Sequence, residues 1–138
     1  KQAVSMPVLA NGDIDSPEKA LAVLQHTGAD GVMLGRAVQG KPWLFREINA
    51  ALEGGEYTPV QTAEMREVML SHIKALHHFY GEHQGLRIAR KHCAWYLQDF
   101  NNVDFRRHFN RLEDASAQLD AVQSFFEQHS DKLQDAAA

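Results

Sequence analysis

Two short apolar segments, each followed by a glycine and then by a helix-like stretch, constrain the fold of this chain more than any other feature. The first is residues 7–10, which lead into Gly12, and the second is residues 31–34, which lead into Gly35. One helix-length segment separates them. This order predicts a parallel strand–helix–strand unit whose two glycines lie at the carboxyl edge of the sheet, where parallel α/β folds bind phosphate groups.

The segment between the two predicted strands carries the start and stop signals of a helix. Ser16 can cap its amino end, and Gly28 is placed to end it. After the second strand and a tight glycine-bounded loop, the pattern predicts a further helix over residues 43–52, with Leu52 facing inward. The first third of the chain is therefore of the α/β class.

The composition changes after residue 56, and nothing beyond it resembles a strand. Apolar residues at helical spacing predict four helices. The first starts near Thr58 or Thr62 and runs to Tyr80, and the others cover about 86–99, 105–112 and 113–129. Phe79 and Tyr80 are expected on the inward face of the first, and Asn110 with Glu113 resembles a capping box before the last. We therefore expect two domains, an α/β domain over residues 1–56 and a helical bundle over residues 57–138.

A parallel sheet of two strands has unpaired edges and needs cover on both faces. Residues 1–56 therefore need additional strands, supplied either by a preceding part of the protein or by a second copy of the chain. The sequence begins at Lys1 without an initiator methionine. We expect it to be the last part of a larger enzyme.

Composition narrows the class of protein. The net charge of −4 gives no overall signature of nucleic-acid binding, so any basic surface must be local. The single cysteine, Cys93, excludes an internal disulfide and suits a reducing compartment. No apolar run approaches the roughly 18 residues of a membrane-spanning helix. These features predict a cytoplasmic protein that does not contact a membrane.

The residues that follow the two strands form the first candidate site. They are Asn11, Gly12 and Asp13 after the first strand, and Gly35 and Arg36 after the second. Glycine lets the backbone approach an anion closely, and an arginine adds a permanent charge that suits phosphate. Each pair alone could be an ordinary turn. Their presence on neighbouring strands favours a phosphate site.

A local basic stripe is the second candidate site. Residues 86–111 contain six Lys or Arg and two acidic residues, whereas residues 112–138 contain one Lys and six acidic residues. The basic residues are Arg87, Arg90, Lys91, Arg106, Arg107 and Arg111. The spacing places Arg87, Arg90 and Lys91 on the polar face of their helix. The stripe can contact a phosphate backbone, or it can be a solvated face paired with the acidic last helix.

Neither the cysteine nor the histidines form a recognisable catalytic or metal site. Cys93 falls on the apolar face of its helix, which is typical of a buried side chain rather than a reactive thiol. His77 and His78 are adjacent and so point to different faces, and the histidines lack the spacing of a metal site. We expect no metal and no catalytic residue in this chain.

Several of these motifs together resemble the carboxyl end of bacterial tRNA-dihydrouridine synthases. The matching segments are residues 7–14, 28–37, 40–45, 85–92 and 105–110. The last two are most similar to the B subfamily, and the likeness extends to about Phe126.

The resemblance implies a (β/α)8 TIM barrel that holds FMN, followed by a helical domain that helps to hold tRNA. It implies that the flavin, reduced by NADPH, delivers hydride to a uracil ring. Asn11, Gly12 and Asp13 would then lie in one FMN phosphate loop of the barrel, after strand seven, and Gly35 and Arg36 in the next, after strand eight. The family's catalytic cysteine belongs to an earlier strand, and Cys93 does not match its motif. The resemblance therefore implies that this chain alone is inactive.

Two alternatives remain open. Another FMN-binding or sugar-phosphate-binding barrel would share the two glycine loops but not the basic helices. Alternatively, the helical part could be a module that binds proteins rather than RNA.

Overall fold

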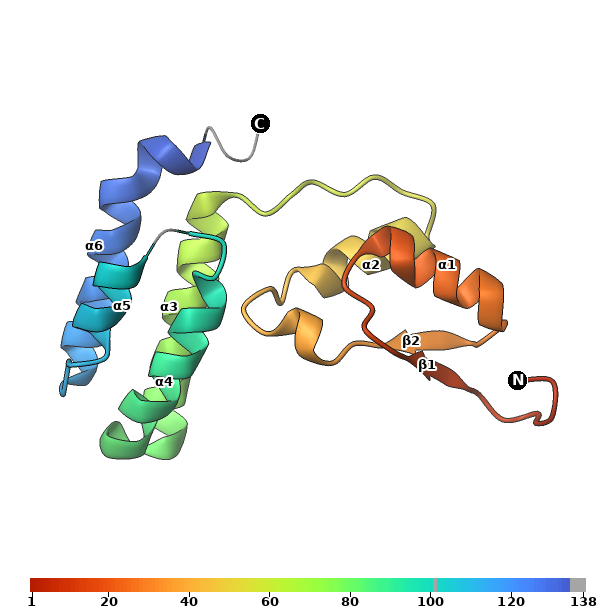
Figure 1. Cartoon of the computed structure of the whole chain (residues 1–138), viewed down its shortest axis with the longest axis horizontal. Coiled ribbons are helices and arrows are strands. Elements are labelled where there is room, and N and C mark those ends of the chain that lie inside the picture. The colour runs from red at the N-terminus through yellow and green to blue at the C-terminus, as the bar shows by residue number, and fades with distance from the viewer. Residues whose placement is uncertain (101, 135–138) are drawn as a thin grey trace. The chain divides into compact units, whose positions relative to one another are not determined.

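The computed structural model describes residues 1–100 and 102–134, with side chains described as far as residue 129 (Figure 1). The chain divides into two compact units. The N-terminal unit is residues 1–59, and the helical unit begins at Val60.

The N-terminal unit contains the predicted parallel strand–helix–strand arrangement. Its elements in order are β1 (Leu9–Asn11), α1 (Pro17–Thr27), β2 (Gly31–Met33), the short 3-10 helix η1 (Arg36–Val38) and α2 (Leu44–Leu52). β1 and β2 pair in parallel, with Leu9 opposite Gly31 and Asn11 opposite Met33. The strand–helix–strand prediction is confirmed, although each strand is only three residues long.

Helix α1 begins and ends at the predicted residues. The Ser16 hydroxyl accepts a hydrogen bond from the Lys19 amide at 3.2 Å. Gly28 adopts a left-handed backbone conformation, with φ 63°, and donates to the Leu24 carbonyl at 2.9 Å. A glycine at this position ends the helix at no steric cost, so the chain can turn back into β2.

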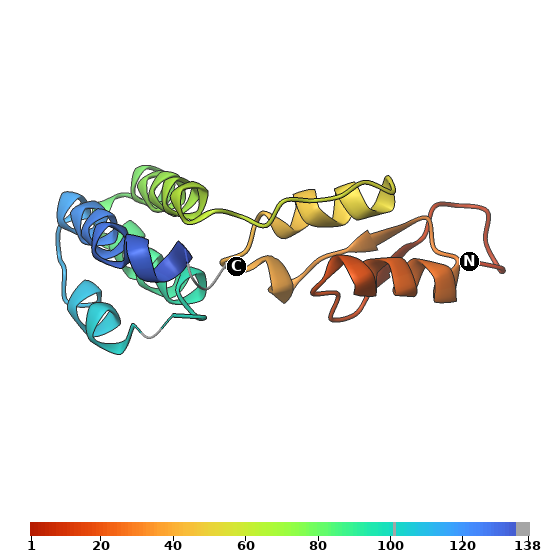
Figure 2. The same ribbon diagram turned by 90° about the horizontal axis from the view of Figure 1, so that it is seen from above.

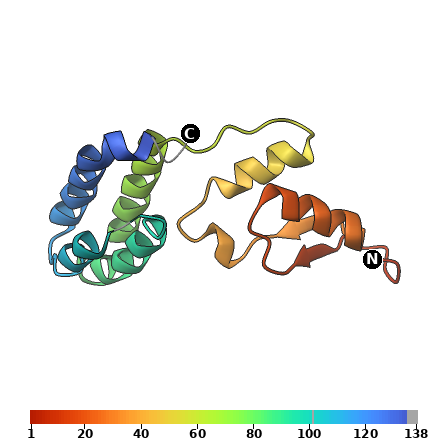
Figure 3. The same cartoon turned by 45° about the horizontal axis from the view of Figure 1, so that its top comes forward.

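Within the N-terminal unit, whose residues are all described, helices cover one face of the two-stranded sheet. On that side Ile14, Ala20, Leu44 and Ile48 form a buried core, against which Val32 of β2 packs, among other side chains. Helix α1 contacts both strands, and α2 packs against α1 (Figure 3). On the opposite face Leu9 is 61% exposed and Met33 is 53% exposed.

The prediction that Leu52 of α2 faces inward is wrong. Leu52 is exposed, because Ile48 and Leu44, which lie one and two turns earlier, are the buried residues of the inward face.

The helical unit consists of α3 (Thr62–Tyr80), α4 (Glu82–Tyr96), α5 (Val103–Phe109) and α6 (Ala115–Gln134). Helices α3, α4 and α6 pack side by side, and α5 contacts α4 and α6 (Figure 2). The buried side chains come from all four helices and the residue after α4; they include Met69, Ile73, Ala89, Cys93, Leu97, Phe109, Val122 and Phe126.

Helices α3 and α4 approach each other very closely at Gly85. A Cβ atom at this position would lie 2.7 Å from the His77 Cα atom and 2.9 Å from the Leu76 carbonyl oxygen. Only Gly81, with φ 73°, separates the two helices. Because the turn needs just this one residue, α4 begins at Glu82, four residues earlier than predicted.

The inward face of α3 also differs from the prediction at its carboxyl end. Phe79 is 79% exposed and Tyr80 is 44% exposed, whereas His77 is buried. The His77 Nε2 atom lies 2.9 Å from the Gln118 Oε1 atom of α6, and the Gln118 amide also donates to the Leu86 carbonyl. A buried polar bridge between three helices therefore replaces the expected aromatic contacts.

The amino end of α6 has a different cap from the predicted one. The Asp114 carboxylate accepts hydrogen bonds from the Ala117 amide at 2.8 Å and the Ser116 hydroxyl at 2.7 Å. These contacts make Asp114 the capping residue, in place of the expected Asn110 and Glu113. They also lower the pKa of the Asp114 carboxyl.

Candidate functional site

The structure brings the five predicted phosphate-site residues to one edge of the sheet. Asn11 and Met33 form the last paired position of β1 and β2, so Gly12 and Gly35 both follow at the carboxyl ends of the strands. The Arg36 Nη2 atom lies 2.7 Å from the Asp13 Oδ1 atom. This ion pair joins the loop after β1 to the loop after β2.

Both glycines at this edge face open space. A Cβ atom at Gly12 or Gly35 would meet no heavy atom within 4 Å beyond its chain neighbours. Asp13 has a positive φ of 43°, a left-handed conformation that aspartate tolerates better than most residues. The edge therefore offers exposed backbone at two positions where a ligand can come close.

The charged groups at the edge are accessible to solvent. The side chains of Arg36 and Asp13 are 83% and 78% exposed. An ion pair this exposed stabilises the fold by only about 0–1 kcal/mol. An anionic ligand can therefore take the place of the Asp13 carboxylate on the Arg36 guanidinium at little cost, which is the chemistry of a phosphate-binding edge.

The predicted basic stripe divides between two helices. On α4, Arg87 and Lys91 are exposed and line a shallow groove of about 790 Å³. Arg106 and Arg107 on α5 and Arg111 after it are also exposed, but they do not line this groove. Arg107 pairs with Asp104 at 3.3 Å. The structure thus brings Arg87 and Lys91 together and leaves the other arginines on a neighbouring element.

Arg90 does not lie on the polar face with Arg87 and Lys91, so the predicted placement is wrong. Its side chain is part-buried, and its Nη2 atom donates to the Leu112 carbonyl at 3.3 Å. The Nε atom is buried without a hydrogen-bond partner. Arg90 lies beside Ala89 at the margin of the buried face, which turns it toward the segment that leads into α6. It supports the packing of the helical unit.

Cys93 is buried in the helical core, as its position on the apolar face predicts. Burial raises the pKa of its thiol to about 12, so the reactive thiolate is scarce at neutral pH. Cys93 therefore has the environment of a small core residue.

A ring cluster joins α3 to the outer face of α4, and the sequence pattern did not reveal it. The rings of His72 and His92 lie 4.7 Å apart, and the His72 Nδ1 atom lies 3.0 Å from the Tyr96 hydroxyl. His92 also meets Trp95 edge to face at 4.9 Å. The spacing of His92, Trp95 and Tyr96 within one helical turn was the available signal. Burial lowers the pKa of both His72 and His92.

The lowered pKa values of His72 and His92 predict how the stability of the helical unit depends on pH. A lowered pKa means that the unfolded chain binds protons before the folded one as the pH falls below about 6.5. The stability should therefore be constant above this pH and decrease below it. We expect a lower melting temperature at about pH 5.5 than at about pH 7.5 by circular dichroism. The double variant His72→Gln, His92→Gln should lose most of this difference. An equal pH dependence in both proteins would contradict the prediction.

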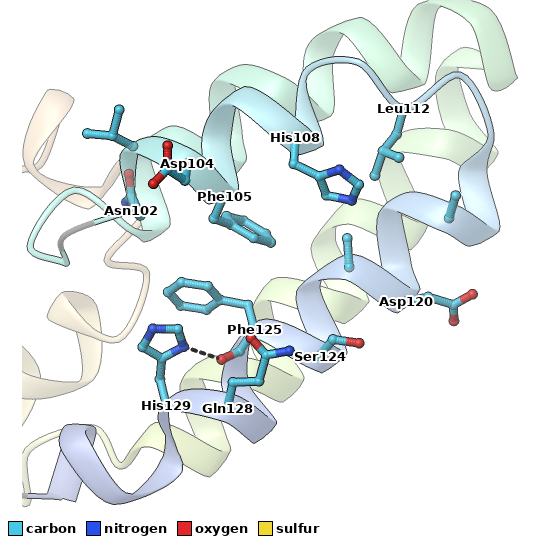
Figure 4. Close-up of a pocket in the computed structure, with 13 residues that line it drawn as sticks. Asn102, Asp104, Phe105, His108, Leu112, Asp120, Ser124, Phe125, Gln128 and His129 are labelled. Carbon is cyan, nitrogen blue, oxygen red and sulfur yellow. Dashed lines mark hydrogen bonds between the residues drawn. The ribbon is translucent and has the colours of Figure 1, made fainter.

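A second groove lies between α5 and α6, with a volume of about 810 Å³ (Figure 4). Phe105 and Phe125 face each other across it, and the His129 Nδ1 atom donates to the Phe125 carbonyl at 2.8 Å. The acidic residues Asp104 and Asp120 lie along it. None of the predicted site residues lines this groove.

The N-terminal unit is thus of the parallel α/β class whose strand ends bind phosphate groups. The sequence profile of the dihydrouridine synthase (Dus) family matches residues 1–131. This chain belongs to the dihydrouridine synthase family, as its motifs predict.

Curated relatives agree with the family profile. The chain is 55% identical over 129 residues to tRNA-dihydrouridine synthase B of Pectobacterium carotovorum, and likewise to that of Escherichia coli K12. It is 54% identical over 134 residues to that of Serratia marcescens. The alignments cover 92% to 96% of this chain but 40% of each relative. The chain therefore spans about two fifths of their length.

No helix within the described part of the chain is long and apolar enough to cross a membrane.

Proposed function

We propose that this chain forms part of an FMN-dependent tRNA-dihydrouridine synthase, which reduces uridines in tRNA with NADPH as the reductant. The N-terminal unit would be the last two strand–helix units of a (β/α)8 barrel, and the helical unit would bind tRNA. The observation that carries the proposal is the meeting of the Gly12 and Gly35 loops at one carboxyl edge, with Arg36 between them.

The exposed face of the sheet supports the barrel assignment. In such a barrel, helices cover the outside of the strands and alternate side chains fill the inside. Leu9 and Met33 lie on the face opposite α1, where they are largely exposed. These apolar side chains would fill the barrel interior once the remaining strands are present.

The carboxyl edge fits the phosphate of FMN. Gly12 and Gly35 leave room for close approach, and the exposed Arg36 guanidinium can form two parallel hydrogen bonds with phosphate oxygens. Asn11 and Asp13 complete the first loop, and the Asp13 carboxylate holds Arg36 near the edge until the phosphate takes its place. The bound flavin would supply the hydride for the uracil ring, and the residues of this chain would anchor and orient the cofactor.

The helical unit offers cations for an RNA backbone. Arg87 and Lys91 on α4, with Arg106, Arg107 and Arg111, are exposed on a protein whose net charge is −4. RNA is held largely by its shape and its phosphates, and such contacts need local positive charge. A uracil ring must also leave its base stack to meet a flavin. The helical unit would hold the tRNA while this happens.

The double variant Arg87→Gln, Lys91→Gln tests the proposal in the full-length protein that carries this segment. The unaltered protein should form dihydrouridine in unmodified tRNA when FMN and NADPH are present. We expect the variant to raise KM for tRNA about 10-fold with little change in kcat, because it removes contacts that bind the RNA rather than groups that react. The salt dependence of tRNA binding should also become shallower, by roughly one unit of slope per lost contact.

Lys19→Gln is the matched control, since it removes an exposed charge from α1. It should leave KM unchanged. Absence of dihydrouridine with the unaltered protein would refute the proposed activity. An unchanged KM in the double variant would refute the role of α4.

A further inference from the structure

The groove along α4 brings an aromatic ring and two cations together. The groove is lined by His83, Gln84, Arg87, Ile88, Lys91, His92 and Trp95. Lys91 and Arg87 lie about one and two turns before Trp95, or roughly 6 and 12 Å along the helix axis. None of the described residues that line this groove is an aspartate or a glutamate. A polyanion fits these charges better than a neutral or basic partner does.

The Trp95 ring is held in place from two sides. The Lys91 Nζ atom lies 4.7 Å from the ring centroid, and the His92 ring contacts Trp95 edge to face. His92 in turn packs against His72, which pairs with the Tyr96 hydroxyl. The indole is therefore oriented before any ligand arrives, on a helix rather than on a loop.

We propose that Trp95 is a stacking platform for an unpaired base of the bound RNA, with Lys91 and Arg87 holding the adjacent phosphates. The inference rests on the proposed function and names the feature of the RNA that this surface recognises. Phosphate contacts alone need no aromatic ring, whereas unpaired bases stack on aromatic side chains that lie beside cations. The base would displace the Lys91 ammonium from the ring face toward a phosphate.

A comparison of single-stranded and duplex RNA tests the platform, because a base inside a duplex is already covered by its neighbours. The chain would be titrated with a tRNA transcript, with a single-stranded RNA oligomer and with the same oligomer in a duplex. Trp95→Leu should weaken binding of the transcript and the single strand about 10-fold, within the range measured for one stacked base. Trp95→Phe keeps an aromatic face and should retain most of the affinity. Binding of the duplex should not change.

Fluorescence gives a second measurement in a protein that keeps Trp95. The chain has two tryptophans, so Trp43→Phe leaves Trp95 as the sole indole. Single-stranded RNA should quench its emission, and the duplex should not. Thermal unfolding of Trp95→Leu shows whether that variant is folded. If it is not, the quenching measured in Trp43→Phe decides whether a base stacks on Trp95.

The outcomes separate this inference from the proposed function. If Arg87→Gln, Lys91→Gln weakens RNA binding but Trp95→Leu does not, or if no quenching occurs, the platform is refuted and the RNA surface stands. If neither variant changes RNA binding, both the stacking platform and the RNA surface of α4 are refuted. The groove would then fit a protein partner instead.

Discussion

Valine at Gly35 is expected to weaken the binding of FMN strongly while leaving the fold of the N-terminal unit unchanged. A Cβ atom at this position meets no heavy atom within 4 Å, so the larger side chain enters open space rather than the core. That space is the position in which the phosphate would approach the backbone. We expect the affinity for FMN to fall by about 100-fold, because the side chain excludes the phosphate from several hydrogen bonds at once.

The comparison of FMN with riboflavin makes this test specific for the phosphate. Titration of the full-length apoprotein should show that Gly35→Val weakens FMN binding but leaves riboflavin binding unchanged, since riboflavin has no phosphate. Ala22→Val introduces the same valine side chain at an exposed position of α1 and serves as the control. Equal losses for both flavins, or none for either, would show that this edge does not hold the phosphate.

The strand–helix–strand unit and its edge could be predicted because local signals determine them. Ser16 and Gly28 set the bounds of α1 through contacts within a few residues. Glycine after each strand then follows from the parallel pairing, which places Gly12 and Gly35 at one edge. The ion pair between Asp13 and Arg36 spans 23 residues and could not be read from the pattern. It depends on the register of β1 against β2.

The failures arose where packing between helices overrides periodicity. Phe79 has the spacing of an inward residue, yet its ring is exposed, and His77 occupies the buried position beside α6 instead. Arg90 has the chemistry of a surface residue, yet the Leu112 carbonyl holds its guanidinium at the margin of the core. The sequence around Trp95 predicts an ordinary helix. It does not predict the ring cluster, because that cluster needs His72 of α3 to lie beside His92. Each outcome depends on a contact between residues that are 20 or more positions apart in the sequence.

Gly85 is the position at which a single substitution should damage the helical unit most. A valine there would place its Cβ 2.7 Å from the His77 Cα atom and 2.9 Å from the Leu76 carbonyl oxygen. Both are backbone atoms of α3, so no side-chain rotation relieves the overlap and the helices must separate. Separation would also stretch the bridge from His77 through Gln118 to the Leu86 carbonyl.

We expect Gly85→Val to lower the free energy of unfolding by about 3 kcal/mol, at the upper end of the usual cost of overpacking. For a unit of this size the melting temperature should fall by roughly 12 to 24 °C in circular dichroism. Gln84→Val is the matched control, because it places the same residue at the adjacent, exposed position of the same helix. Its melting temperature should change little. A Gly85→Val protein as stable as the control would mean that α3 and α4 do not depend on this close approach.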